Sequence, residues 1–189
     1  MRSRLVLFSI VFVAVTLTGA FVTGFFLPRQ WQASAQATVR ATPAAIHPLV
    51  NDPRRWPEWF PWSKVKAPDI RYSYSGAETG VGAVLSWTST NVGQGTLTLT
   101  SSDPATGVTY DLVIGGFNSL PIRGSIAFQE AGGVTTVTLQ EGGELDVNPI
   151  ARLFRGVIEG KLEHELNGAL ERLSALAEGR TPPVEPPPR

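Results

Sequence analysis

The chain has 189 residues, with five tryptophans and nine phenylalanines, which is enough for one domain with a substantial core and short for two. Sixteen basic and sixteen acidic side chains balance, so the charge predicts no attraction to nucleic acid. The absence of cysteine excludes disulfides, thiolate metal sites and cysteine nucleophiles.

The N-terminal segment from Leu5 to Leu27 contains 23 residues without a charge. As a helix it would be roughly 34 Å long, enough to cross the hydrocarbon core of a bilayer. A cleavable signal peptide is the alternative, but its apolar stretch is usually about 7 to 15 residues. The best cleavage site, at residues 33–35, also lies well past Leu27. We therefore expect residues 1–29 to form an uncleaved transmembrane anchor.

Basic residues flank this segment unequally, because Arg2 and Arg4 precede it and only Arg29 follows it closely. The positive-inside rule then places the N-terminus in the cytoplasm and the rest of the chain outside it. The expectation is a single-pass membrane protein with an extracytoplasmic domain.

Residues 31–41 alternate between apolar and polar side chains, which predicts a first strand. Thr42 and Pro43 are typical of a helix start, and a short amphipathic helix should end at residues 51–53. Two prolines interrupt residues 54–63, which predicts a helical turn or an irregular segment that carries four large aromatic side chains.

A string of short alternating runs follows, separated by turn-forming residues, and predicts an antiparallel meander. The six runs are residues 70–74, 82–89, 95–101, 108–114, 122–128 and 134–141. Residues 149–178 then carry apolar side chains at helical spacing, which predicts one helix of about 30 residues, capped by Asn148 and closed by Gly179. Five prolines in residues 180–189 favour a disordered tail.

Several motifs within this order resemble one family. They are Asn51-Asp52-Pro53, the tryptophan motif Trp56-Pro57-Glu58-Trp59-Phe60-Pro61-Trp62, Gly76 with Gly80-Val81-Gly82-Ala83, Trp87, and Asn148-Pro149 at the start of the last helix. The chain resembles the SRPBCC or START-like superfamily, in particular its polyketide cyclase/dehydrase and lipid-transport branch.

The resemblance implies an α+β helix-grip fold over residues 30–179. In this fold a seven-stranded curved antiparallel sheet grips a long C-terminal helix, in the order β-α-α-β6-α, here with an N-terminal transmembrane helix in addition. It also implies a hydrophobic cavity between sheet and helix, since members bind lipids, sterols, polyketides or other apolar molecules, and some catalyse cyclisation or dehydration.

Our first hypothesis is a membrane-anchored binding domain for a lipid or another hydrophobic small molecule, stabilised by apolar burial. The membrane contact would be made by residues 5–27. The candidate ligand-binding residues are large and apolar or aromatic: Trp56, Trp59, Trp87, Tyr110, Phe117, Phe128, Phe154 and Ile158.

A polyketide cyclase or dehydratase is the alternative, and it needs an acid or base inside the cavity. The candidates are His47 and two carboxylates near the end of the last strand, Glu141 and Glu144, which lie close to Asp146. Structural roles for all of them are equally compatible with the sequence, and no catalytic motif is present. The sequence therefore favours binding over catalysis.

A third hypothesis is a ligand-free interaction domain at the membrane, whose core would be filled with side chains. His164 lies in a run of charged residues typical of a solvated helix face, and neighbouring residues on a helix point apart, so no metal site is predicted. No cofactor is predicted either, and the oligomeric state is open.

Overall fold

The structure is a computed structural model that describes all residues except 1, 65, 116–118, 146–148 and 184–189. Its helices are α1 (Arg2–Phe26), α2 (Pro43–Asn51), the 3-10 helix η1 (Pro53–Glu58), α3 (Pro149–Leu153) and α4 (Arg155–Ala177). Its strands are β1 (Gln30–Val39), β2 (Arg71–Gly76), β3 (Ala83–Ser89), β4 (Gly93–Asp103), β5 (Gly107–Ile114), β6 (Leu120–Ala131) and β7 (Val134–Glu144).

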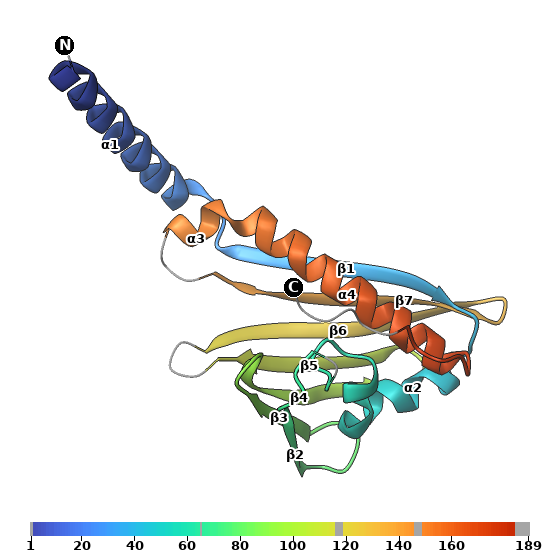
Figure 1. The fold of residues 1–189 in the computed structure, drawn as a ribbon. Coiled ribbons are helices and arrows are strands. Elements are labelled where there is room, and N and C mark those ends of the chain that lie inside the picture. The colour runs from blue at the N-terminus through green and yellow to red at the C-terminus, as the bar shows by residue number, and fades with distance from the viewer. Residues whose placement is uncertain (1, 65, 116–118, 146–148, 184–189) are drawn as a thin grey trace.

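The seven strands form one antiparallel sheet in the order β1-β7-β6-β5-β4-β3-β2. Strands β2 to β7 follow one another as a meander, and β1 pairs with β7 at the far edge. The long helix α4 lies beside β1, and α2 and η1 close one end of the sheet (Figure 1). The predicted α+β fold with a seven-stranded sheet and a long C-terminal helix is confirmed.

Side chains alternate between a buried face and a solvent-exposed face of the sheet, as the period of two in a strand requires. We call the buried side the inner face. Its large members include Trp31, Leu85, Trp87, Leu97, Leu99, Tyr110, Leu112, Ile122, Ile126, Phe128, Val137 and Leu139. The opposite face carries threonine, serine and glutamine, which explains why the strands could be recognised from their alternation.

The predicted single C-terminal helix is wrong in one respect, because the chain is divided at Phe154 into α3 and α4. Neither proline nor glycine stands at this position, although Gly156, a residue of low helix propensity, follows in the first turn of α4. The short helix α3 instead packs against the end of α1, while α4 continues along β1. The predicted cap Asn148 lies outside the described residues.

Three aromatic side chains of the inner face lie over glycines directly opposite them on the neighbouring strand. Trp31 pairs with Gly143, Trp87 with Gly95, and Tyr110 with Gly124. A Cβ atom added to Gly124 would lie 2.0 Å from the Cζ atom of Tyr110, and one on Gly95 would lie 2.3 Å from Cζ2 of Trp87. Glycine inside these strands therefore allows a large ring to lie close to the backbone of the sheet.

Helix α1 extends away from the domain and meets it only at its C-terminal end (Figure 1). There Gly24 touches α3, since an added Cβ would lie 2.3 Å from the carbonyl oxygen of Pro149. The Arg152 guanidinium donates to the carbonyl oxygens of Gly24, Phe25 and Leu27 at 3.4, 3.1 and 3.4 Å. Cations at a helix C-terminus stabilise it through the helix dipole, so α3 serves as the cap of α1.

Within the described part of the chain, no helix combines the length and the apolar character that a membrane crossing needs. The structure thus gives no support to the transmembrane anchor expected from residues 1–29.

Candidate functional site

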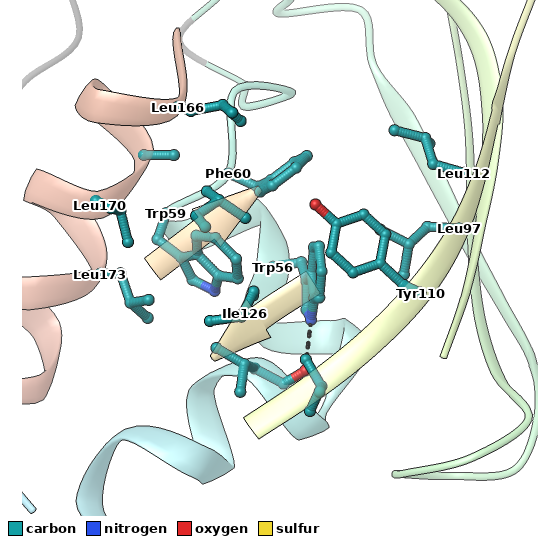
Figure 2. Close-up of a cluster of buried hydrophobic side chains, with 14 of the residues drawn as sticks. Trp56, Trp59, Phe60, Leu97, Tyr110, Leu112, Ile126, Leu166, Leu170 and Leu173 are labelled. Carbon is teal, nitrogen blue, oxygen red and sulfur yellow. Dashed lines mark hydrogen bonds between the residues drawn. The ribbon is translucent and has the colours of Figure 1, made fainter. Parts of the chain in front are cut away.

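The tryptophan motif, residues 56–62, fills one end of the inner face. The indole N–H of Trp56 donates to the carbonyl oxygen of Val50 at 2.9 Å, and that of Trp59 donates to Leu49 at 3.0 Å. Both side chains are fully buried, and Trp56 meets the ring of Tyr110 edge-on at a centroid distance of 5.0 Å (Figure 2). These three predicted ligand-binding residues therefore pack on one another.

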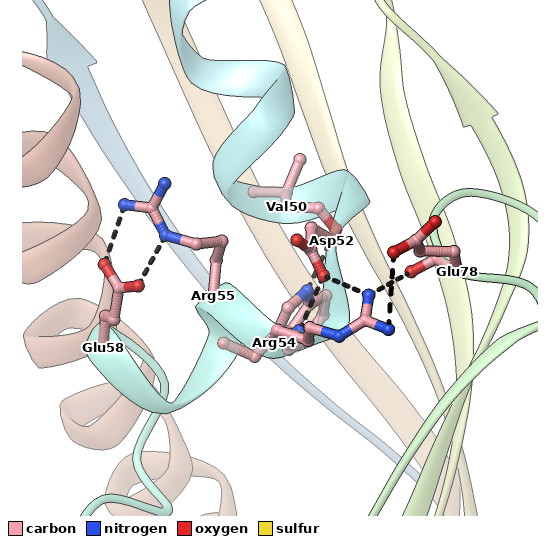
Figure 3. A network of polar contacts seen from close by, with 7 residues as sticks. Val50, Asp52, Arg54, Arg55, Glu58 and Glu78 are labelled. Atoms are coloured by element: carbon pink, nitrogen blue, oxygen red, sulfur yellow. Dashed lines mark hydrogen bonds and ion pairs between the residues drawn. The ribbon is translucent and has the colours of Figure 1, made fainter. Parts of the chain in front are cut away.

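Ion pairs hold the start of this motif against the sheet. Arg54 on η1 reaches Asp52 and Glu78, donating to the carbonyl oxygen of Glu78 at 3.0 Å, and Arg55 pairs with Glu58 through two hydrogen bonds (Figure 3). Because Glu78 belongs to the loop between β2 and β3, the network ties η1 to the edge of the sheet that β2 forms. These contacts thereby hold the tryptophan motif in position.

A buried polar pair lies within this apolar face. The hydroxyl of Tyr110 donates to Oε1 of Glu141 at 2.7 Å, and both side chains are buried. Burial raises the pKa of Glu141 to about 7, partly offset by the hydrogen bond from Tyr110. Burial also raises the pKa of Tyr110 well above its usual range, with a further contribution from the Glu141 charge. The pair can hold or release one proton near neutral pH.

The apolar stripe of α4 is covered along only part of its length. Its members recur at helical spacing: Ile158, Leu162, Leu166, Leu170 and Leu173. The last three are fully buried, whereas Ile158 and Leu162 are only partly buried. The chain thus covers the C-terminal half of the stripe and leaves the N-terminal half accessible.

Three further apolar side chains, Trp62, Tyr72 and Ile114, are also only partly buried. Trp62 stacks on Trp87 with a centroid distance of 3.9 Å and an angle of 20° between the rings. The Tyr72 hydroxyl donates to the carbonyl oxygen of Trp62 at 2.8 Å. Trp62, Tyr72 and Ile114 pack against the core. We group these three residues with Ile158 and Leu162 as the partly covered apolar side chains of the inner face, and call the group the open end.

The remaining predicted ligand-binding residues lie in different places. Phe128 is buried in the core, while Phe154 is 57% exposed at the junction of α3 and α4. Phe117 lies outside the described residues. Among the described residues of the predicted set, Ile158 belongs to the open end and Trp87 contacts it through Trp62. The choice of ligand-binding residues stays a prediction.

The predicted acid-base candidates do not form one cluster. Glu141 faces inward, whereas Glu144 is exposed and pairs with Arg29 at 3.6 Å. Strand β7 extends through both residues, and a spacing of three along a strand places side chains on opposite faces. Asp146 lies outside the described residues. Glu141 and Glu144 therefore lie on opposite faces of the sheet, and a catalytic role for either stays a prediction.

His47 lies on α2, away from the inner face, with Nε2 2.9 Å from the Ser102 hydroxyl, which donates to Asn51 at 2.6 Å. Burial lowers the pKa of His47, partly offset by Asp103. The contact joins α2 to β4, which accounts for this histidine structurally. The described residues contain no group of three histidine, aspartate or glutamate side chains that could hold a metal ion.

A pocket of about 940 Å³ opens at the end of the sheet near residue 28. Its lining includes Trp31 and Ile122, but also the charged side chains of Arg123, Arg155 and Glu159. Arg123 is exposed, as expected from its alternation in β6. None of the seven predicted ligand-binding residues that the structure describes lines this mixed-polarity pocket.

A comparison with models of protein families identifies the family of this chain. The family described as polyketide cyclase/dehydrase and lipid transport matches residues 30–178, from the start of β1 to the end of α4. The chain belongs to this family. The resemblance seen in the tryptophan motif is thereby confirmed.

Several solved structures have a similar fold. A point mutant of Thalictrum norcoclaurine synthase, in complex with a transition-state analogue, has a TM-score of 0.58 at 12% identity, covering 79% of this chain and 95% of its own. Ara h 8.0201 has a TM-score of 0.57 at 12% identity, with 80% and 99% coverage. DynU16, a protein in the dynemicin biosynthetic locus, has a TM-score of 0.57 at 16% identity, and the match covers 83% of this chain and 51% of DynU16. These likenesses show the fold alone. No curated protein sequence matches significantly.

Reasoning from the sequence missed one side chain of this polyketide cyclase/dehydrase family member, Arg172, and one contact, that of Tyr110 with Glu141. Arg172 is buried on α4 and donates from Nε to the carbonyl oxygen of Trp59 at 2.8 Å. An arginine among the leucines of an apolar stripe was the available signal. Tyr110 was identified as a ring, but its bond to Glu141 depends on a cross-strand register that alternation does not reveal.

Proposed function

We propose that this domain binds a lipid or another hydrophobic small molecule at the open end of the inner face. The observation that carries the proposal is the uncovered part of the α4 stripe, where Ile158 and Leu162 continue a row whose other members are buried. Apolar surface left uncovered beside a packed core gains about 25 cal/mol for each Å² that a ligand removes from water. Membership of a family named for lipid transport and polyketide chemistry supports the same ligand class.

Native mass spectrometry of the full chain, purified from its host and followed by organic extraction, tests the proposal. We expect a stoichiometric lipid or polyketide-like molecule. An empty protein that also refuses a panel of apolar probes would instead favour the ligand-free interaction domain.

A matched pair of variants locates the site. Ile158→Ser should weaken ligand binding because Ile158 lies on the apolar stripe. Val157→Ser is the control, since Val157 is 71% exposed and lies off that stripe. Equal binding by the two variants would contradict a site at the open end.

The buried Tyr110–Glu141 pair favours a second candidate, acid-base catalysis of cyclisation or dehydration. A carboxyl group with a pKa near 7 can accept and return a proton at physiological pH. The test is formation of an aromatic product from a linear poly-β-ketone, followed by absorbance. Glu141→Gln should abolish turnover while Glu144→Gln retains it, and turnover by both variants would exclude this role for Glu141.

Attachment of α1 to a membrane remains a proposal. It is supported by the uncharged sequence from Leu5 to Leu27 and by the exposure of apolar side chains such as Phe12 and Leu17. A chain with Phe12→Lys and Val15→Lys should lose its retention in the membrane pellet after alkaline extraction. Single cysteines, introduced into this cysteine-free chain, would report topology through a membrane-impermeant reagent.

A further inference from the structure

The indole ring of Trp87 is clamped between two neighbours. On one side lies the backbone of Gly95, directly opposite on β4, where an added Cβ would overlap the ring. On the other side the ring of Trp62 stacks at 3.9 Å. The side chain is 2% exposed, so its position and the direction of its N–H group are fixed.

The N–H group of this ring is buried and has no hydrogen-bond acceptor in the part of the chain that the structure describes. Two other tryptophans of the packed core differ, because Trp56 and Trp59 donate to the carbonyl oxygens of Val50 and Leu49. Buried donors without an acceptor are rare and cost free energy. A polar group absent from the free protein would explain why this donor is kept.

The position of Trp87 connects this donor to the open end. Tyr72 and Ile114 occupy the same cross-strand row as Trp87, one on each side, and both are only partly buried. The Tyr72 hydroxyl is already bonded to the carbonyl oxygen of Trp62, so it does not serve Trp87. Trp87 thus lies at the border between the packed core and the open end.

We infer that Trp87 Nε1 donates a hydrogen bond to the bound molecule, which is therefore an apolar compound with a carbonyl or ether oxygen rather than a pure hydrocarbon. This inference rests on the proposed binding function. It adds one hydrogen-bond donor to a site that is otherwise mostly apolar. The side chains of the open end are aliphatic or aromatic, and only its tyrosine and tryptophan carry polar atoms. One such bond in an apolar site gives orientation as well as affinity.

Two probes of nearly equal shape test the inference. 2-Acetylnaphthalene and 2-isopropenylnaphthalene differ in a carbonyl oxygen that replaces a methylene group. Each is titrated into the full chain held in lipid nanodiscs, with empty nanodiscs as the correction for partitioning. We expect the acetyl compound to bind roughly three- to tenfold more tightly, the effect of one net hydrogen bond. The indole N–H resonance of Trp87 should shift with the acetyl compound alone.

Trp87→Phe removes the N–H group and keeps an aromatic ring, so the variant should bind both probes equally and lack the assigned resonance. Trp62→Phe is the control: it weakens the stack but leaves the donor, and it should keep the preference for the acetyl compound. Equal binding of the probes by the unmodified chain, without a shift at Trp87, would overturn the inference and leave the binding function standing. Binding of neither probe would overturn both.

Discussion

The ring of Tyr110 occupies the space that a side chain at position 124 would need, and Gly124 is the residue that makes this possible. Because the ring lies across the neighbouring strand, its hydroxyl reaches Glu141 on the strand beyond, 2.7 Å away. A single glycine thus brings together the tyrosine and the carboxylate that form the only buried hydrogen-bonded side-chain pair we find on the inner face of the described residues.

Gly124→Ala should destabilise the protein by about 1–3 kcal/mol, because the new methyl group collides with the Tyr110 ring. Urea unfolding of the full chain measures the loss. Replacing Tyr110 by Leu in the Gly124→Ala background should recover part of it, since the two residues share one space and their effects are not additive.

Gly160→Ala on α4 is the matched control, because nothing lies within 4 Å of the added methyl group. This substitution should leave stability unchanged or raise it by up to about 1 kcal/mol through helix propensity. A similar loss at positions 124 and 160 would show that the ring does not constrain Gly124.

The stability contributed by Glu141 should fall as the pH rises. Below pH 4.5 the carboxyl group is protonated in both the folded and the unfolded chain. Above pH 4.5 the Glu141 carboxyl group ionises in the unfolded chain, whereas in the folded chain it ionises only near pH 7. The folded state therefore loses about 3 kcal/mol between these values relative to Glu141→Gln, which cannot ionise.

The measurement is urea unfolding of both proteins from pH 4.5 to 8. Comparison with Glu141→Gln cancels the contribution of His47, whose lowered pKa acts in the opposite direction. Glu144→Gln should keep the pH dependence of the unmodified chain, because Glu144 is exposed. Parallel pH profiles for the unmodified chain and Glu141→Gln would contradict the raised pKa.

Arg172→Met should cost about 1–3 kcal/mol, because the carbonyl oxygen of Trp59 loses its donor in a buried setting. Glu171→Gln, an exposed neighbour on the same helix, should change stability by no more than about 0.5 kcal/mol. Thermal or urea unfolding distinguishes the two. An unchanged midpoint for Arg172→Met would mean that the bond to Trp59 contributes nothing net.

Gly24→Ala should loosen the joint between α1 and the domain, because the methyl group would overlap the carbonyl oxygen of Pro149. Spin labels on single cysteines at the exposed positions Thr16 and Ser34 report the distance between α1 and β1. Its distribution should be narrow in the unmodified chain and broader in Gly24→Ala. Gly19→Ala meets nothing within 4 Å and should leave it narrow, and equal widths in all three would refute a fixed joint.

Much of the fold could be predicted because the strands have one buried and one solvent-exposed face. The runs at residues 83–89 and 107–114 alternate clearly, and the boundaries of their strands differ from the prediction by only one residue. The break at Phe154 could not be predicted, since the apolar periodicity of the sequence continues through it. It depends on the contact of α3 with α1, which joins segments more than 120 residues apart.

The site was harder to predict than the fold for a physical reason. Burial of Glu141 and exposure of Glu144 follow from the length of β7, which continues three residues beyond the predicted end. The position of the unpaired Trp87 donor depends on the stack with Trp62, and that stack requires the fold of the intervening loop. Side-chain types could be read from the sequence, whereas their partners across the sheet could not.

Two of the ring-over-glycine pairs of the inner face, Trp87 with Gly95 and Tyr110 with Gly124, impose a rule on the evolution of this family, because at both the ring is the group nearest to an added Cβ atom. At each of these two pairs, a larger residue in place of the glycine is tolerated only when the opposing ring becomes smaller. Sequences related to this chain should therefore change at positions 87 and 95, and at positions 110 and 124, in a correlated manner. Those correlations would trace the register of β3 against β4 and of β5 against β6 without any coordinates.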